Sequence, residues 1–545
     1  MSSDVNDSSI TITCQKTGLY RGLNIPVTLI SKLIITLLVV FAVALPDRAV
    51  ALLTTINQTM LEHFNLYYVY AVAFYLVFCT VLCVSPLGRK RLGRDDEVPE
   101  FSRFAWFSMM FGAGMGIGLL FYSIGEPVSH FNFNPDIAAG KVQAGSEQAI
   151  ESAVSYTFLH WGLHAWAIYA SVALALGYFA YRRGLPLTIR STLMPIFGKR
   201  LLDGPLGHAV DIIAVVATTL GVATTMGAGV SQLVAGLDFV MPGTELLDSA
   251  GIPRPWPLIL TLVVIMGLST LSAVTGVKRG VNWLSQFNML LSFALLAVFI
   301  WFGSRLFASE LLVSATWDYL RTLPERSFQT WPVTSALGQW QVDWTILQRA
   351  WFIAFAPFVG LFLARISRGR TIREFVLGAV VAPSFMCFVW ICYMGGSSLH
   401  METSGLAQGT ILATVRDHIA TVLFVTLDYL DTGALIPVIV GGTLILILII
   451  TYLVTSADSG VLVLNAIMAG GEETNERRHR IIWGVLLTLV VGSLLLAGGL
   501  AAIQKAMLIA SLPFSLLMIL MCIATFISLW REPSDLPAVN EAEPT

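Results

Sequence analysis

The chain has 545 residues and a formal net charge of −2, with 56% of its residues hydrophobic and only 12% charged. Soluble domains carry about 25% charged residues, so this composition is typical of a membrane protein and excludes both an ordinary soluble protein and a nucleic-acid partner. The cysteines lie in the N-terminal tail or inside apolar runs without the spacing of a metal site, so we interpret them as reduced and structural.

Apolar runs of about 20 residues, the length that an α-helix needs to cross a bilayer, recur along the chain. The first such run is too long for a signal peptide and lacks a cleavage site, so we keep it as a transmembrane helix. The fold class is therefore an all-α polytopic membrane protein. We predict twelve transmembrane helices, at residues 26–46, 67–87, 103–124, 149–180, 208–240, 256–275, 282–306, 344–365, 375–398, 434–468, 480–502 and 505–530.

Lysine and arginine cluster after every second predicted helix, at residues 89–94, 182–200, 278–279, 365–373 and 477–480. By the positive-inside rule these loops face the cytoplasm, which also places both termini there. The chain is thus expected in the bacterial inner (plasma) membrane, with residues 1–25 as a cytoplasmic tail and residues 531–545 as a short acidic cytoplasmic tail.

The predicted helices divide into a peripheral pair and two sets of five. Residues 26–100 hold the pair, residues 101–306 the first five-helix repeat and residues 344–530 the second, with an external amphipathic connector at 307–343. An odd number of helices inverts the second set, which indicates a LeuT-like 5+5 inverted repeat. This architecture predicts that the first helix of each repeat is discontinuous and that the solute site lies between the two.

The third predicted helix carries four glycines at alternate positions, Gly112, Gly114, Gly116 and Gly118. Each costs about 1 kcal/mol relative to alanine in a helix interior. One interpretation is close helix packing through two GxxxG pairs. The other is an unwound segment whose backbone holds a cation or the anionic end of a solute.

Aromatic side chains gather in the fourth predicted helix, where Trp161, Trp166 and Tyr169 span an arc of about 140° if the helix is continuous. Several aromatic faces together form the cage that binds quaternary ammonium groups, although plain packing is the alternative. His160 and His164 are spaced four apart, but the Glu that a zinc hydrolase needs beside the first His is absent. We therefore expect neither a metal centre of this kind nor an enzyme.

The tenth predicted helix holds Thr455 and Ser456 at membrane depth. Their hydroxyl oxygens are hard ligands suited to Na⁺, and polar groups at this depth are usually functional. The alternative is that each hydroxyl bonds back to its own helix.

These features together resemble the betaine/choline/carnitine transporter family over nearly the whole chain. The strings that carry the resemblance are Gly114–Gly118, the Trp161/Trp166/Tyr169 run, Pro357–Gly360, the arginine-rich run Ala364–Phe375, and Thr455–Ser459. The resemblance implies a homotrimer of twelve-helix protomers and an aromatic box for an onium head group.

The resemblance also implies roles for particular residues. It assigns Trp161, Trp166 and Tyr169 to the box, and the unwound segment, with Ala113, Met115, Gly116 and Gly118, to the other end of the solute. One sodium site would use the Gly112, Met115 and Tyr452 carbonyls and the Thr455 and Ser456 hydroxyls. Thr218 matches part of a second sodium site, where Val222 replaces a threonine of some sodium-coupled members. No other cofactor is expected.

The eighth predicted helix departs from the family pattern. Trp351 remains, but Phe352 and Phe355 stand where tryptophan is common, and Arg349 stands where an aromatic residue is expected. A positive charge about 6 Å from a bound cation costs on the order of 3 kcal/mol at an effective dielectric of 20. If Arg349 reaches the site, a solute with an anionic end is favoured over a net cation; the alternative is that Arg349 snorkels to the interface.

We therefore predict ion-coupled import of a zwitterionic onium solute of the glycine betaine type by alternating access, with the lipid bilayer and a homotrimer as its surroundings. Proton-driven choline uptake is the main alternative. Carnitine, ectoine, a sulfonium compound and taurine stay open as solutes, and sodium, protons or exchange as the coupling mode. A channel and an intramembrane hydrolase are the hypotheses from other classes.

Overall fold

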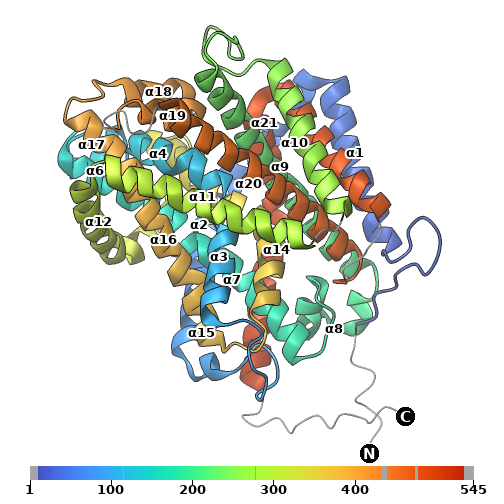
Figure 1. Ribbon diagram of the computed structural model, residues 1–545. Helices are drawn as coiled ribbons and strands as arrows, with labels where there is room; N and C mark the ends of the chain where they lie inside the picture. Colours follow the sequence, from blue (N-terminus) through green and yellow to red (C-terminus); the bar gives the residue numbers. More distant parts are fainter. Residues whose placement is uncertain (1–9, 115, 276–277, 431–437, 473–476, 533–545) are drawn as a thin grey trace, which may run out of the picture.

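The computed structural model describes residues 10–114, 116–275, 278–430, 438–472 and 477–532. Within these ranges the chain is almost entirely helical and contains no β-strand (Figure 1). Eleven of the described helices are long and apolar enough to cross a membrane. The predicted all-α polytopic membrane fold is confirmed.

The eleven helices and the twelve predicted spans differ for three reasons. The third span is two short helices, α3 (Arg103–Gly114) and α4 (Ile117–Asn132). The eleventh and twelfth spans form one helix, α21 (Arg477–Arg531), which bends at Gly498 and at Gly499, where φ is 67°. The eleven also include an unpredicted stretch at 410–427, formed by α18 (Thr410–His418), η7 (Ile419–Thr421) and α19 (Val422–Leu427).

The first two helices lie against the rest of the bundle. α1 (Ile25–Ala44) begins at Asn24, whose side chain accepts a hydrogen bond from the Val27 amide at 3.2 Å. It packs on α21 and α9 (Pro205–Val240), while α2 (Pro46–Val84) packs on α21 and α7 (Leu163–Gly177). Leu33 and Leu37 of α1 are more than half exposed, as expected of side chains that contact lipid.

The fourth span is broken in the middle, which the sequence interpretation missed. α6 (Glu147–Trp161) ends and α7 begins at Gly162, whose ψ of −138° is not helical. A Cβ at this position would lie 2.5 Å from the Phe158 carbonyl oxygen and 2.8 Å from the Phe388 ring, so glycine is required. The 140° arc assumed a continuous helix from Trp161 to Tyr169 and was therefore wrong.

The prediction of a discontinuous first helix in each repeat holds only for the first. There, α3 ends at Gly114 and Gly116 is extended, with φ of −161°, before α4 starts. In the second, α14 (Leu347–Ile366) is continuous, so that prediction was wrong. α14 lacks the run of glycines that breaks the third span, and Pro357 removes only one backbone donor from it.

Close contact between α14 and α7 positions the candidate site. A Cβ on Gly360 would lie 2.5 Å from Cγ1 of Val172, so only glycine allows this approach. One π-helical turn, η4 (Gln341–Ile346), leads from α13 (Ala336–Trp340) into α14. The other described helices of the bundle are α10 (Pro255–Thr275), α11 (Lys278–Phe302), α15 (Ile372–Val376), η5 (Leu377–Val381), α16 (Ala382–Ile391), η6 (Cys392–Gly396), α17 (Ser397–Thr403) and α20 (Val438–Met468).

The predicted connector contains one long helix, α12 (Arg305–Arg326), at the opposite edge of the bundle from α1 (Figure 1). It packs on α6, and its Arg326 donates to Asp136 of α5 (Pro135–Ala138) at 2.8 Å and to Asp318 at 3.0 Å. Its amphipathic character agrees with Leu311 and Tyr319 being buried while Trp317 is exposed. Its location outside the membrane stays a prediction, as does the inverted repeat.

The arginine-rich run after α14 forms a polar cluster with the loop after α2. Arg370 pairs with Glu374 at 2.6 Å, and Arg91 donates to the Gly369 carbonyl at 2.7 Å. Arg182 donates to Glu532 at 2.6 Å, which anchors the end of α21 to this cluster. The short helices in these and the remaining loops are η1 (Pro86–Arg89), η2 (Tyr178–Arg182), η3 (Arg190–Leu193) and α8 (Met194–Leu202).

Candidate functional site

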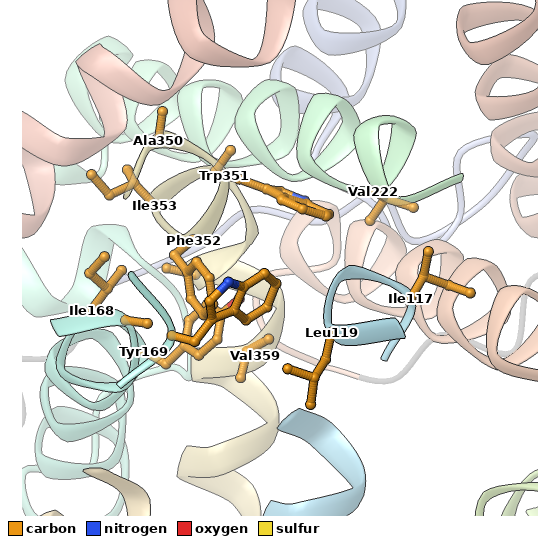
Figure 2. Packing of buried hydrophobic residues seen from close by; sticks show 14 of the residues in the cluster. Ile117, Leu119, Ile168, Tyr169, Val222, Ala350, Trp351, Phe352, Ile353 and Val359 are labelled. Atoms are coloured by element: carbon orange, nitrogen blue, oxygen red, sulfur yellow. The ribbon is translucent and has the colours of Figure 1, made fainter. Parts of the chain in front are cut away.

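Three of the predicted aromatic residues meet between α6, α7 and α14. The Phe352 ring lies 5.1 Å from the Tyr169 ring and 5.7 Å from the Trp161 ring, centroid to centroid. Figure 2 shows Phe352 and Tyr169 pointing toward one another from facing helices. All three are less than 9% exposed. We call Trp161, Tyr169 and Phe352 the aromatic cluster.

The other predicted box residues lie around this cluster or apart from it. Trp166 packs edge-on against Tyr169 at 5.7 Å. Trp351 points toward the Val222 side of the site (Figure 2) and donates a hydrogen bond from its indole to Thr225 of α9 at 3.2 Å. Phe355 is half-buried and contacts Phe358, and among the described residues it makes no ring contact with the aromatic cluster.

The start of α4 closes the site between the two tryptophans. A Cβ on Gly118 would lie 3.0 Å from Cη2 of both Trp161 and Trp351, so this glycine lets the backbone sit between the rings. Apart from its chain neighbours, no described residue has a heavy atom within 4 Å of the Cβ position of Gly116. The surroundings of Gly112 and the side chain of Ala113, at the end of α3, are not described, and Met115 lies outside the described residues.

Tyr122 is a further member of this region that sequence reasoning missed. It lies one turn after Gly118 on α4, and its ring centroid is 6.2 Å from that of Trp161 and 6.1 Å from that of Trp351. The spacing of four residues from Gly118 places both on one face of α4 and was the available signal.

Arg349 lies inside the protein and does not reach an interface. It is 4% exposed, and none of its three guanidinium nitrogens has a hydrogen-bond partner among the described residues. The prediction that it snorkels to the membrane surface was therefore wrong. Arg349 precedes Phe352 by three residues on α14, so the two side chains leave neighbouring positions of one helix face.

Other buried arginines show how unusual this environment is. Arg190 pairs with Asp211 at 2.6 Å, Arg326 with Asp136 at 2.8 Å and Arg370 with Glu374 at 2.6 Å. Arg349 instead has no carboxylate partner among the described residues, and the ring nitrogens of nearby His164 also lack a described hydrogen-bond partner. A buried cation without a counter-charge is strongly unfavourable, so this position is suited to binding an anion.

A buried carboxylate stands directly behind the aromatic cluster. Glu126 of α4 is fully buried, and Oε2 accepts hydrogen bonds from the Trp161 indole at 2.7 Å and from the Gln348 amide at 3.3 Å. Its Oε1 accepts from Nε2 of His130 at 3.3 Å and from Nδ1 of His160. Sequence reasoning missed Glu126 and used His160 only in rejecting a metal site.

Glu126, His130 and His160 lie close enough together to suggest a metal site, with ligand atoms within 4.8 Å of one another. However, both ring nitrogens of each histidine already have protein partners. Nδ1 of His130 accepts from the Trp340 indole at 3.1 Å, and Nε2 of His160 is 2.8 Å from the Thr345 hydroxyl. A ligand nitrogen needs its lone pair for the metal, so we interpret this group as a hydrogen-bond network.

The predicted sodium ligands are divided among α3, α9 and α20. The Thr455 hydroxyl donates to the Thr451 carbonyl at 2.9 Å and accepts from the Asn288 amide of α11 at 3.2 Å. Thr218 donates to the Ala214 carbonyl at 2.7 Å. Both hydroxyls thus bond back to their own helices, as the alternative interpretation expects, and each still has a lone pair for a cation.

The other predicted sodium ligands lie on α20 and in the segment from the end of α3 to the start of α4. Tyr452 is buried on α20 and Ser456 is half-buried one turn later, whereas Gly112 and Met115 fall in the segment discussed above. Val222 packs against Gly460, whose Cβ would lie 3.1 Å away, and it offers no oxygen. The sodium sites stay a prediction.

Comparison with known proteins gives a consistent result. Residues 26–534 match the model of the family described as BCCT, betaine/carnitine/choline family transporter. The chain is 37% identical to the glycine betaine transporter OpuD of Bacillus subtilis, covering 93% of this chain and 94% of that protein. It is 35% identical to a glycine betaine transporter of Acinetobacter baylyi, covering 96% of this chain and 76% of that protein. It is also 35% identical to the osmo-independent choline transporter BetT1 of Acinetobacter baylyi, covering 88% of each.

Proposed function

Because the chain belongs to the betaine/carnitine/choline transporter family, we propose that it imports a zwitterionic onium solute of the glycine betaine type by ion-coupled alternating access. Two of its relatives are named glycine betaine transporters, and they match most of its length. The observation that carries the proposal is the buried guanidinium of Arg349, which has no described hydrogen-bond partner and lies three residues before Phe352 of the aromatic cluster on α14.

The aromatic cluster supplies the contact for the onium head. Each ring face attracts a cation by about 0.5 to 2 kcal/mol, with indole the strongest of the three ring types. The Tyr169 and Phe352 centroids are 5.1 Å apart and therefore in contact with one another. A trimethylammonium group held between the two rings requires them to separate, which fits a site that changes shape during transport.

Arg349 supplies the contact for the carboxylate. Opposite unit charges 4 Å apart attract by about 4 kcal/mol at an effective dielectric of 20. Arg349 lies one helical turn from Phe352 on α14, a separation of about 5 Å along the axis. Glycine betaine carries its carboxylate two bonds from the nitrogen, so one small molecule spans both contacts. The unwound segment before α4 is then a second contact for the carboxylate.

Choline uptake is the second candidate, because the chain is also similar to a protein named a choline transporter. Choline has the same trimethylammonium head but a hydroxyl in place of the carboxylate. A net cation about 6 Å from the Arg349 charge is repelled by about 3 kcal/mol at the same dielectric. This repulsion favours binding of the zwitterion over binding of choline.

Further parts of the proposal rest on the family resemblance. We propose a homotrimer in the bacterial inner membrane with both termini in the cytoplasm. Na⁺ at the Tyr452, Thr455 and Ser456 group is one proposed coupling ion; a proton is the other. Mass determination in detergent tests the homotrimer, and accessibility labelling tests the location of the termini. Uptake with imposed gradients tests the coupling ion.

The experiment that tests the solute class uses a matched pair of ligands. Purified protein is titrated calorimetrically with glycine betaine and with choline, in sodium and in potassium buffer. We expect glycine betaine to bind at least tenfold more tightly than choline. Tighter binding of choline would refute the zwitterion proposal, and binding of neither would refute the onium proposal altogether. Taurine, carnitine and ectoine complete the panel.

A further inference from the structure

We propose that Glu126 and His160 form a proton-binding site, that the exchangeable proton sits on Nε2 of His160, and that this site is linked to solute binding through Trp161. The inference rests on the proposed solute transport and adds a coupling ion and the group that binds it. It follows from comparing the hydrogen bonds that Glu126, His130 and His160 make in each of their protonation states.

Glu126 is held in its ionised form. An ionised carboxylate only accepts hydrogen bonds and has about four lone-pair sites. Its four contacts come from nitrogen groups on Trp161, Gln348, His130 and His160, two at each oxygen. The indole and the amide are donors in every protonation state, and adding a proton to Oε2 would break one of these bonds.

His130 is held in its neutral form. The Trp340 indole donates to Nδ1 of His130 at 3.1 Å, and indole N–H groups cannot accept. Nδ1 must therefore keep its lone pair, and the ring proton lies on Nε2, which donates to Glu126. A second proton on His130 would place two N–H groups against each other.

His160 differs because its second nitrogen faces a hydroxyl. Nδ1 bonds to Glu126, and Nε2 lies 2.8 Å from Oγ of Thr345. The Thr345 hydroxyl donates to Nε2 when that nitrogen is bare and accepts from it when it is protonated. Both charge states of the Glu126–His160 pair thus keep all their hydrogen bonds without moving a heavy atom.

Burial makes the pair sensitive to its net charge. Glu126 and His160 are almost completely buried, and a buried net negative charge is strongly unfavourable. The proton on His160 makes the pair neutral. The titratable groups near the pair are His130 and Tyr122 on α4 and His164 on α7. Tyr156 on α6 packs on the other side of Trp340, and beyond it Arg326 is neutralised by Asp136 and Asp318. Arg349 on α14 lies near Tyr319 and His164.

Trp161 connects this pair to the solute. It follows His160 in the chain, donates to Glu126 and presents its ring to Phe352. The network also joins α4 and α6 to the π-helical turn η4 through Thr345. Solute and proton both favour the closed arrangement of these helices, and by thermodynamic linkage each then raises the affinity for the other.

The test measures the protons taken up when glycine betaine binds. Purified full-length protein is titrated between pH 6 and 9 in pairs of buffers with different ionisation enthalpies. We expect proton uptake that approaches one per solute at alkaline pH. In that range the dissociation constant should rise by about tenfold per pH unit, which is the linkage of one proton.

Two variants separate the roles of the histidines. His160→Asn keeps a donor near the position of Nδ1 but has no titratable group, so we expect no proton uptake and an affinity that does not change with pH. His130→Gln keeps a donor near Nε2; whatever it does to affinity, we expect proton uptake to persist. Proton uptake in His160→Asn that equals the wild type would overturn the assignment, as would its loss in His130→Gln alone.

Transport in sodium-free vesicles completes the test. We expect an inward proton gradient to drive accumulation of glycine betaine by the wild-type protein and not by His160→Asn. Accumulation that follows a sodium gradient and ignores the proton gradient would overturn the proton site and leave the solute proposal standing. If glycine betaine fails to bind at any pH, the proposed solute is wrong as well, so the two failures are distinguishable.

Discussion

Replacing Arg349 with glutamine tests the central electrostatic argument. The side chain is buried and its guanidinium has no described partner, so the substitution removes one unit charge next to Phe352 and breaks no described hydrogen bond. We expect two opposite effects. Glycine betaine should bind more weakly, while the solute-free protein should become more stable, because an uncompensated buried charge has been removed.

The magnitude follows from separations of about 4 Å and about 6 Å assumed for the bound solute. Loss of an ion pair at 4 Å removes about 4 kcal/mol from glycine betaine binding, and relief of repulsion at 6 Å returns about 3 kcal/mol to choline binding, both at an effective dielectric of 20. Relaxation and water entry reduce such sums by a factor of two to three. The ratio of the two dissociation constants should therefore change by about 100-fold in favour of choline, since 1.4 kcal/mol is tenfold.

The assay is calorimetric binding of both solutes, together with thermal unfolding of the purified protein in detergent. Arg349→Lys retains the charge and should retain a preference for glycine betaine. Arg416→Gln removes an arginine that is paired with Asp417 at the exposed surface, and it should leave both affinities unchanged. A betaine-to-choline ratio within threefold of the wild type in Arg349→Gln would refute the contact between Arg349 and the solute.

Three further substitutions test the packing that builds the site. Gly118→Val should weaken glycine betaine binding at least tenfold, measured by tryptophan fluorescence, because its Cβ would lie 3.0 Å from the Trp161 and Trp351 rings; unchanged binding would show that α4 does not set the ring positions. Arg326→Met removes the buried partner that Asp136 and Asp318 share and leaves them only the more exposed Lys141 and Arg321, so it should lower the free energy of unfolding, seen as a lower Tm; an unchanged Tm would contradict a structural ion pair. Gly360→Leu should separate α7 from α14, lowering both the Tm and the transport rate in vesicles, and full activity would refute close packing there.

The fold was largely predictable from the sequence because bilayer-spanning helices have a strong signal. Long apolar runs separated by basic loops identify helices whatever their partners are. The glycines at 112–118 left helix packing and an unwound segment as alternatives, and the break between α3 and α4 agrees with the second, since such a run is unfavourable in a helix. The break between α6 and α7 at Gly162 has no such run around it. The Phe388 ring, which is far away in the sequence, packs against this glycine.

The sequence predicted the parts of the candidate site that single residues or short motifs indicate, and it missed the parts that depend on contacts between distant residues. Trp161 and Tyr169 were singled out by residue type and Phe352 by the family resemblance, and the structure brings the three together. Glu126 was missed because its partners His160 and Gln348 are 34 and 222 residues away in the chain. The four-residue spacing of Glu126 and His130 on α4 was an available signal for one contact, but the rest of the network exists only once the helices have packed.

The unpaired guanidinium of Arg349 has a consequence for the transport cycle itself. When the carrier closes around a zwitterion, the solute carboxylate neutralises this charge; when it closes empty, nothing described does. The empty carrier should therefore reorient slowly, and the loaded one quickly. Labelled solute should leave preloaded vesicles faster when unlabelled solute is present outside. A cell with such a carrier would retain its accumulated solute once the external supply has gone.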